Sequence, residues 1–179
     1  MKSIAFLGRG GQGIVFAASI LAEALFKKGY YVVQLQSYGA EVRGGSVLAY
    51  VIVDDKKVEN PFIEAFDVAI VLHEAGAKRW NKLLENTDLT IVDKDLVMTK
   101  TGKQVVEAPI VSELVSNNLS GRENMASIGM LQGLGLIDID EETMLSILRE
   151  KKDWEANIRA YKLGVSIGEK LKDILNTAR

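Results

Sequence analysis

A glycine-rich segment near the N-terminus has the residue types and the spacing of an anion-binding turn. It reads Gly8-Arg9-Gly10-Gly11-Gln12-Gly13, and its glycines at 8, 10 and 13 follow the G-x-G-x-x-G spacing. Glycine permits a tight turn and leaves no side chain between the backbone and a ligand. The amide groups that start the following helix carry partial positive charge, and Arg9 adds a full charge, so we expect a phosphate here. The alternative is that the glycines only allow a close strand-to-helix crossover.

A second glycine-bearing loop follows the next expected strand and should lie beside the first turn. It runs from Ser37 to Ser46 and contains Tyr38, Arg43, Gly44 and Gly45. In a doubly wound sheet, ligands bind at the carboxyl ends of the strands, where both segments would lie. The planar guanidinium of Arg43 could bind a carboxylate or a phosphate, and Tyr38 offers a flat ring with a hydroxyl. The alternative is an ion pair between Arg43 and Glu41 that only orders the loop.

The end of the second strand lacks the acidic residue that a nicotinamide dinucleotide site needs. Such a site places Asp or Glu about 20 residues after the glycines, where the carboxylate binds the ribose hydroxyls. Here the segment is Val33-Gln34-Leu35-Gln36-Ser37, which contains neither an acid nor an arginine for a 2′-phosphate. The nearest carboxylate is Glu41, in the next loop. This absence counts against a free-standing NAD dehydrogenase.

The order of apolar runs and helical patterns predicts an α/β sheet around these loops. Ile4–Leu7 is an unbroken apolar run, which is typical of a strand buried on both faces. From Gln12 the apolar residues follow helical spacing, and Gly29 is expected just beyond the helix end. Tyr30–Leu35 is the next expected strand. Strand, glycine turn, helix and strand in about 35 residues match the length of a βαβ unit.

The rest of the chain extends this pattern. Strands are expected at 46–53, 68–72, 89–92 and, at an edge, 105–108, with a short return strand at 57–60. Helices are expected through Ala77, Trp80 and Leu84, at 110–119, at 123–135, at 141–151 after an N-cap at Asp140, and along a last segment towards Ile174. We therefore predict a single domain over 1–179 with the helices of about 123–176 packed on it. Its fold class is three-layer α/β/α, with a mostly parallel, doubly wound, Rossmann-like sheet and a helical C-terminal tail.

Composition and charge restrict the classes of function. Hydrophobic residues make up 47% of the chain and charged residues 26%, and the formal net charge is −2, so we expect a soluble domain that binds neither nucleic acid nor a membrane. There is no cysteine, which excludes a disulfide and a Cys-ligated iron–sulfur cluster within this chain. The single histidine, His73, cannot form a multi-histidine metal site. Because there is no signal-peptide core and no 18-residue apolar run, we expect a cytoplasmic protein.

The two glycine motifs and several later positions together resemble a known family. The second motif is Ser37-Tyr38-Gly39-x-Glu41-x-Arg43-Gly44-Gly45, and the later positions are Pro61, Asp67, Asn124-Met125 and Gly129. In this order they resemble the gamma subunit, or gamma domain, of the 2-oxoacid:ferredoxin oxidoreductases over nearly the whole chain. The second motif is most similar to the 2-oxoglutarate or branched-chain 2-oxoacid branch, and the pyruvate and indolepyruvate branches stay open.

The resemblance implies a reaction to which this chain contributes only a part. In the family, a 2-oxoacid is decarboxylated on thiamine diphosphate with magnesium, electrons pass through iron–sulfur clusters to ferredoxin, and coenzyme A takes the acyl group. This chain has no cysteine and no Gly-Asp-Gly motif of the thiamine diphosphate type. The resemblance therefore implies that alpha, beta and ferredoxin-like delta subunits carry these cofactors. It also implies that this chain is an accessory subunit of an enzyme, without catalytic residues or a metal of its own.

For the chain itself, the resemblance and the glycine turn together point to coenzyme A, because the family's gamma domain is linked with access of that molecule. The residues expected to form the binding surface are Gly8, Arg9, Gly10, Gly11, Gln12, Gly13, Tyr38, Arg43, Gly44 and Gly45. One alternative is that these glycines admit the backbone of a partner subunit. Another, from a different class, is a stand-alone nucleotide-binding or phosphate-ligand module of Rossmann-like fold.

Three further features carry expectations. His73 follows an expected strand at the ligand edge, and a structural role is the default for a lone histidine. Asn124 begins a helix, where it could cap that helix or reach the glycine turn; capping is the default. The apolar helix at 125–134 has few charges to face water, so it is either deeply buried or packed on a neighbour. We expect it to form an exposed apolar patch that partner subunits cover.

Overall fold

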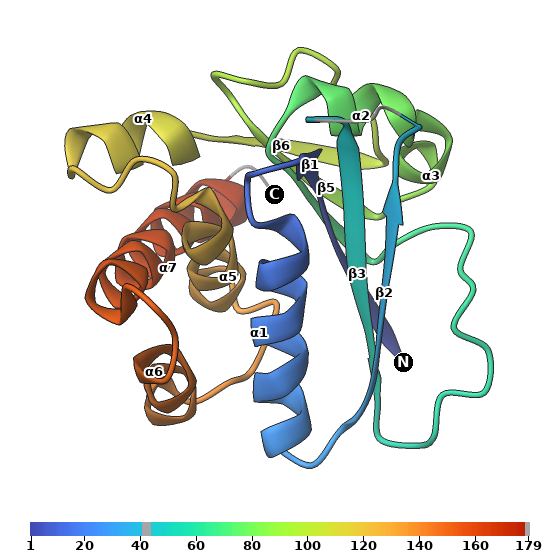
Figure 1. Ribbon diagram of the computed structural model, residues 1–179. Helices are drawn as coiled ribbons and strands as arrows, with labels where there is room; N and C mark the ends of the chain where they lie inside the picture. Colours follow the sequence, from blue (N-terminus) through green and yellow to red (C-terminus); the bar gives the residue numbers. More distant parts are fainter. Residues whose placement is uncertain (41–43, 178–179) are drawn as a thin grey trace.

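The computed structural model describes residues 1–40 and 44–177, which form a sheet with helices on both of its faces (Figure 1). The strands are β1 (Lys2–Arg9), β2 (Tyr31–Tyr38), β3 (Ser46–Asp54), β4 (Val68–Val71), β5 (Leu89–Asp93) and β6 (Gln104–Ala108). The helices are α1 (Ile14–Lys27), α2 (Glu74–Arg79), α3 (Asn81–Glu85), α4 (Ile110–Ser116), α5 (Glu123–Gly133), α6 (Glu141–Arg149) and α7 (Trp154–Thr177). Helices α1 and α5 to α7 lie on one side of the sheet, and α2 and α3 lie on the other, which confirms the three-layer fold class.

The strand order is β2-β3-β1-β4-β5-β6. The four adjacent strands β1, β4, β5 and β6 run parallel to one another. Strand β3 is antiparallel to both β1 and β2. The sheet is thus mostly parallel, as expected, because β3 alone runs against the others. The expected βαβ unit is different in detail: β3 inserts between the two strands that α1 connects, with Ala49 opposite both Phe6 and Gln36.

The expected short strand at 57–60 does not form, and these residues are irregular. The side chain of Asn60 accepts a hydrogen bond from the Phe62 amide at 3.0 Å. Such a turn offers the backbone an alternative to strand pairing. Pro61, between them, has no amide hydrogen to donate to a neighbouring strand.

Alternate residues of β1 face two separate hydrophobic cores. Ile4 and Phe6 pack in the cluster that includes residues of α1, α5, α6 and α7. Ala5 and Leu7 pack in the smaller cluster with Trp80 and Leu84, beneath α2 and α3. All four β1 side chains are fully buried. This two-sided burial explains why the apolar run at 4–7 contains no alternating polar residue.

Helix α5 is covered by other helices of the same chain. Nine of its 11 residues are buried, between α1 and the long helix α7 (Figure 1). A Cβ atom on Gly129 would overlap the carbonyl oxygen of Tyr161, and one on Gly164 would overlap that of Ala126. The backbones of α5 and α7 therefore touch. The expectation that α5 presents an apolar patch to partner subunits is wrong, because these glycines let α7 cover it.

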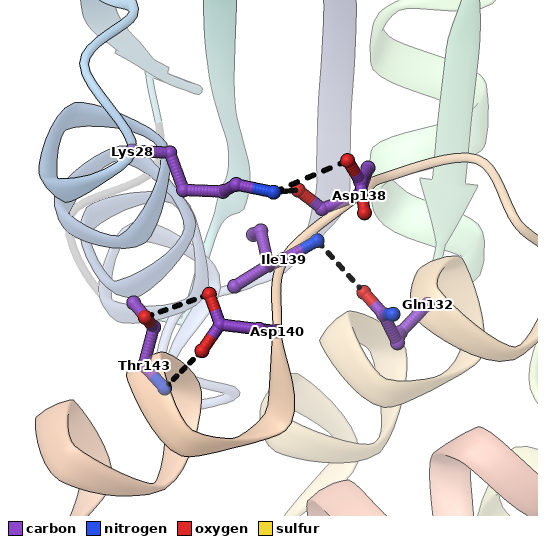
Figure 2. Close-up of polar contacts among 6 residues, drawn as sticks. All are labelled: Lys28, Gln132, Asp138, Ile139, Asp140 and Thr143. Carbon is purple, nitrogen blue, oxygen red and sulfur yellow. Dashed lines mark hydrogen bonds and ion pairs between the residues drawn. The ribbon is translucent and has the colours of Figure 1, made fainter.

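The C-terminal end of α1 is tied to the loop between α5 and α6 (Figure 2). The Lys28 ammonium donates to the carbonyl of Asp138 at 2.7 Å and lies 3.1 Å from its carboxylate. The Gln132 side chain accepts from the Ile139 amide at 3.3 Å. Asp140 accepts from the Thr143 amide at 2.8 Å, so the expected N-cap of α6 is confirmed. Gly29, with a φ of 91°, follows the end of α1 as expected.

None of the helices in the described ranges, 1–40 and 44–177, is both long and apolar enough to span a lipid bilayer.

Candidate functional site at the glycine turn

The glycine turn joins the end of β1 to the start of α1. Gly13 is the N-cap residue of α1 and has a φ of 69°; Gly11 has a φ of 95°. Glycine adopts this left-handed region without the steric cost of a Cβ atom. No side chain in the described part of the chain caps α1, and its first turn contains no acidic residue. The first amides of the helix are therefore available to an anion.

The side chain of Gln12 holds the turn in shape. Its Oε1 atom accepts a hydrogen bond from the Arg9 amide at 2.9 Å, and its Nε2 atom donates to the Leu72 carbonyl at 3.2 Å. The turn after β1 is thereby fixed to the end of β4. A Cβ atom on Gly8 would lie 2.6 Å from the same Oε1 atom, so the small residue at position 8 makes room for this contact.

The second loop lies against the first, as expected. The Gly10 amide donates to the Gly45 carbonyl at 2.8 Å, and a Cβ atom on Gly10 would lie 3.4 Å from the Cα atom of Gly44. Tyr38 is the last residue of β2 rather than part of the loop, and its side chain is 59% exposed. Arg43 and Glu41 lie outside the described residues, so their expected ion pair and the role of Arg43 stay predictions.

Asn124 reaches the glycine turn from α5. Arg122, not Asn124, occupies the N-cap position of that helix. A Cβ atom on Gly13 would overlap Asn124 Nδ2 and lie 3.0 Å from its Cγ atom. The default expectation that Asn124 caps α5 is therefore wrong; its side chain packs against the N-terminus of α1 instead. Its Oδ1 atom accepts from the Met125 amide at 2.9 Å.

His73 lines the other side of the turn. Its Nδ1 atom accepts a hydrogen bond from the Ala75 amide at 3.1 Å, so it caps α2. Burial lowers the pKa of His73, and the nearby Arg9 guanidinium lowers it further, against a weaker opposing effect of Glu74. A neutral imidazole that accepts at Nδ1 carries its proton on Nε2.

Two hollows share Arg9, Gly10 and Gly11 as a common wall. The first has a volume of about 410 Å³ and is also lined by Gln12, His73, Leu96, Gly121 and Glu123. The second has a volume of about 350 Å³ and is also lined by Gly13, Ile14, Val15, Phe16, Tyr38 and Val47. A carboxylate lines the first hollow, whereas the described residues that line the second include Arg9 and two aromatic rings and no carboxylate. The second hollow is the better place for an anion.

Three residues of this site were not expected from the sequence. Phe16 lies in the first turn of α1 and is 38% exposed; an aromatic residue three positions after the last glycine of the turn was the available signal. A Cβ atom on Gly76 would lie 2.7 Å from the Gly8 amide nitrogen, so this glycine lets α2 approach the turn. Leu72 takes part only through its backbone carbonyl, which no side-chain pattern records.

The fold and this site define a class of protein: an α/β domain with a glycine turn at an uncapped helix start and a second glycine loop bonded to it. The sequence model of the family described as pyruvate ferredoxin/flavodoxin oxidoreductase matches residues 3–167. The chain belongs to this family.

Relatives and solved structures agree with this membership. The chain is 31% identical over 170 residues to the 2-oxoglutarate synthase subunit KorC of Archaeoglobus fulgidus, covering 94% of this chain and 89% of that protein. It is 32% identical over 161 residues to the pyruvate/ketoisovalerate oxidoreductases common subunit gamma of Thermococcus litoralis, covering 80% and 85%. The crystal structure of a keto/oxoacid ferredoxin oxidoreductase gamma subunit from Geobacter sulfurreducens superposes with a TM-score of 0.77 at 26% identity, covering 95% and 99%.

A larger protein contains the same fold. The 2-oxoglutarate:ferredoxin oxidoreductase from Magnetococcus marinus, solved with 2-oxoglutarate, coenzyme A and succinyl-CoA bound, superposes with a TM-score of 0.81 at 20% identity. The match covers 94% of this chain and 31% of that one. The resemblance to the gamma subunits of 2-oxoacid:ferredoxin oxidoreductases is confirmed. As a gamma subunit of a multi-subunit oxidoreductase, the chain has partner subunits.

Proposed function

We propose that this gamma subunit supplies the surface that binds the phosphates of coenzyme A in its complex. The observation that carries the proposal is the N-terminus of α1: a left-handed glycine turn, no capping side chain from the described residues, no acid in the first turn, and Arg9 beside it. Backbone amides and a guanidinium are donors that suit phosphate oxygens. The Magnetococcus neighbour with coenzyme A bound supports this choice of ligand.

The second hollow fits the nucleotide half of coenzyme A. Its wall combines the phosphate donors with the rings of Phe16 and Tyr38, which offer flat apolar faces for a base. Its volume of about 350 Å³ lies within the range of small-molecule sites, about 300–1,000 Å³. Arg43, at the second loop, would add a further positive charge; we keep it in the proposed site together with Gly44 and Gly45.

The substrate that we propose for the complex is 2-oxoglutarate or a branched-chain 2-oxoacid. The A. fulgidus relative is named for 2-oxoglutarate, and the T. litoralis relative is named for pyruvate and ketoisovalerate. In the proposed reaction the 2-oxoacid is decarboxylated, two electrons pass to ferredoxin, and coenzyme A takes the acyl group.

The other cofactors are proposed to belong to alpha, beta and ferredoxin-like delta subunits. This chain has no cysteine. Within the described ranges, no group of three or more His, Cys, Asp or Glu side chains is placed to hold a metal ion. Thiamine diphosphate, magnesium and the iron–sulfur clusters would supply the carbon and electron chemistry on the partners. This chain's own residues would orient the acyl acceptor.

A second candidate is that the two loops bind a partner subunit rather than coenzyme A. The observation in its favour is the exposure of the Tyr38 ring at the end of β2, next to glycines that let another backbone approach. In this case, changes at the loops would loosen the complex without altering its affinity for coenzyme A.

Steady-state kinetics of the assembled complex separates the two candidates. We expect Arg9→Ala and Arg43→Ala each to raise the KM for coenzyme A about tenfold, which corresponds to about 1.4 kcal/mol of lost binding. The KM for the 2-oxoacid should not change. Arg149→Ala is the matched control, because Arg149 is an exposed residue at the end of α6. An unchanged KM for coenzyme A together with weaker assembly would refute the coenzyme A site.

A further inference from the structure

The edge strand β2 presents a row of unpaired backbone groups. The Gly39 amide donates to the Ser46 carbonyl, and the same register pairs Leu35 with Tyr50. The odd-numbered residues of β2 therefore point their backbone groups toward β3. In an antiparallel pair the alternate residues point theirs away. Four residues therefore turn their amide and carbonyl groups to the open edge: Val32, Gln34, Gln36 and Tyr38. In the part of the chain that the structure describes, these groups have no recorded partner.

This edge lacks the features that keep sheet edges from pairing. Natural edge strands are protected by charged residues, prolines, bulges or short length. Tyr31–Tyr38 has eight residues, no charge, no proline and no glycine, and its register with β3 is continuous. The opposite edge strand, β6, has five residues and carries Glu107, which pairs with Lys100 at 2.6 Å. One edge of the sheet is protected and the other is open.

The open edge is complementary to itself. We propose that two copies of this chain pair through β2, antiparallel, about a two-fold axis at Leu35. In that register Val32 lies opposite Tyr38 of the other copy and Gln34 lies opposite its Gln36, so all four outward residues find partners. Side chains directly opposite each other lie on the same face of the sheet, and like charges there destabilise the pairing. In this register no charged side chain lies opposite another. Leu35 of each copy lies opposite Leu35 of the other, as a two-fold contact requires.

Exposed aromatic side chains flank the same edge. Phe26 of α1 and Tyr31 of β2 are among the exposed large apolar residues, and neither lines the hollow proposed for coenzyme A. Helix α1 lies over β2, where Gln34 donates to Ser19 at 3.1 Å. A strand pair alone covers less than the area of about 1,000 Å² that a specific interface needs. These rings, brought together from two copies, would supply the additional apolar area.

Cross-linking tests the register directly, since the chain has no cysteine of its own. Opposed residues in a non-hydrogen-bonded pair lie about 4.5 Å apart at Cα, within disulfide range. We expect Leu35→Cys, in the purified full chain and in the assembled complex, to form a disulfide-linked dimer of this chain under mild oxidation. Val105→Cys, at a partly buried apolar position on β6, is the matched control and should form no disulfide-linked dimer. The proposal would be overturned if no disulfide formed between two Leu35→Cys chains, or if Leu35→Cys cross-linked to a different subunit.

A second variant tests whether β2 itself makes the contact. Gln36→Pro removes only an outward amide, so the pairing of β2 with β3 should survive. We expect this variant to keep its circular dichroism spectrum and to sediment as a monomer at concentrations where the unaltered chain sediments as a dimer. A folded Gln36→Pro chain that stays dimeric, or an unaltered chain that is monomeric both alone and in its complex, would contradict the proposal.

Discussion

The side chain of Asn124 lies where any residue other than glycine at position 13 would place its Cβ atom. The overlap is with Asn124 Nδ2, and the Cγ atom is 3.0 Å away. Through this contact α5 fixes the start of α1, while Lys28 and Asp138 fix its other end. The proposed phosphate-binding amides are therefore held by a rigid helix rather than by the loop alone.

Gly13→Ala should lower the free energy of unfolding by about 2–4 kcal/mol, because it adds the overlap with Asn124 to the cost of a left-handed alanine. Gly11→Ala is the control for the backbone alone: its φ is 95° and its Cβ atom would meet nothing within 4 Å. We expect it to cost about 1–2 kcal/mol. Adding Asn124→Ala to Gly13→Ala should recover part of the loss in urea unfolding. Equal losses in the two single variants would disprove the role of Asn124.

Gln12→Ala should lower the free energy of unfolding by about 1–2 kcal/mol, since two backbone groups, at Arg9 and Leu72, lose their partner. Gln104→Ala, an exposed residue of β6, is the control and should stay within about 0.5 kcal/mol. Hydrogen exchange adds a local measurement: the Arg9 amide should exchange faster in Gln12→Ala only. An unchanged exchange rate there would show that Gln12 does not hold the turn.

Gly129→Ala should cost about 3 kcal/mol, because its methyl group would overlap the Tyr161 carbonyl and force α5 away from α7. Ser127→Ala, on the same buried helix, removes only the hydrogen bond to the Glu123 carbonyl at 2.7 Å. We expect it to cost about 1 kcal/mol. Thermal unfolding of both variants measures the difference. If Gly129→Ala were as stable as Ser127→Ala, the close approach of the two helices would be wrong.

Glu74 should make stability depend on pH in the acid range. Burial raises its pKa, but hydrogen bonds from Thr99 and Met98 and the contact with Lys78 outweigh that effect and lower the pKa from 4.5 to about 2. A carboxyl whose pKa falls on folding stabilises the protein above its unfolded pKa and loses that contribution as pH falls toward the folded value. Glu74 should therefore contribute fully above about pH 4.5 and lose its contribution toward pH 2.

Two glutamine variants, one at Glu74 and one at a control position, test this pH dependence. Glu74→Gln should lower the unfolding midpoint at pH 7 and flatten its dependence on pH below 4.5. Glu64→Gln, in the exposed segment after β3, should leave the whole profile unchanged. Parallel profiles for Glu74→Gln and the unaltered chain would contradict the assignment.

The sequence was sufficient to predict where the glycine turn and the second loop lie, but not the neighbours of each strand. The turn at 8–13, its place between a strand and a helix, and its contact with the second loop all followed from glycine spacing and from where parallel strands end. The insertion of β3 between β1 and β2 did not follow, because an apolar pattern records burial and not strand direction.

The packing of α5 was the other feature that the sequence did not predict. The composition of α5 indicated burial but not what buries it. Gly129 and Gly133 are spaced four apart, as are Gly164 and Gly168, and this spacing puts each pair on one face of its helix. Those pairs were the signal that α5 and α7 approach closely. The sequence left open whether Asn124 caps α5 or reaches the glycine turn, because the contact with Gly13 depends on how α5 lies against α1.

The central claim, that the glycine turn binds the phosphates of coenzyme A, is tested most directly by calorimetric titration of the assembled complex with adenosine 3′,5′-bisphosphate, the phosphorylated nucleoside part of coenzyme A. The account predicts saturable binding that Arg9→Ala weakens about tenfold, or by about 1.4 kcal/mol, and that Arg149→Ala leaves unchanged. The same affinity in all three complexes, or no binding to any of them, would contradict it.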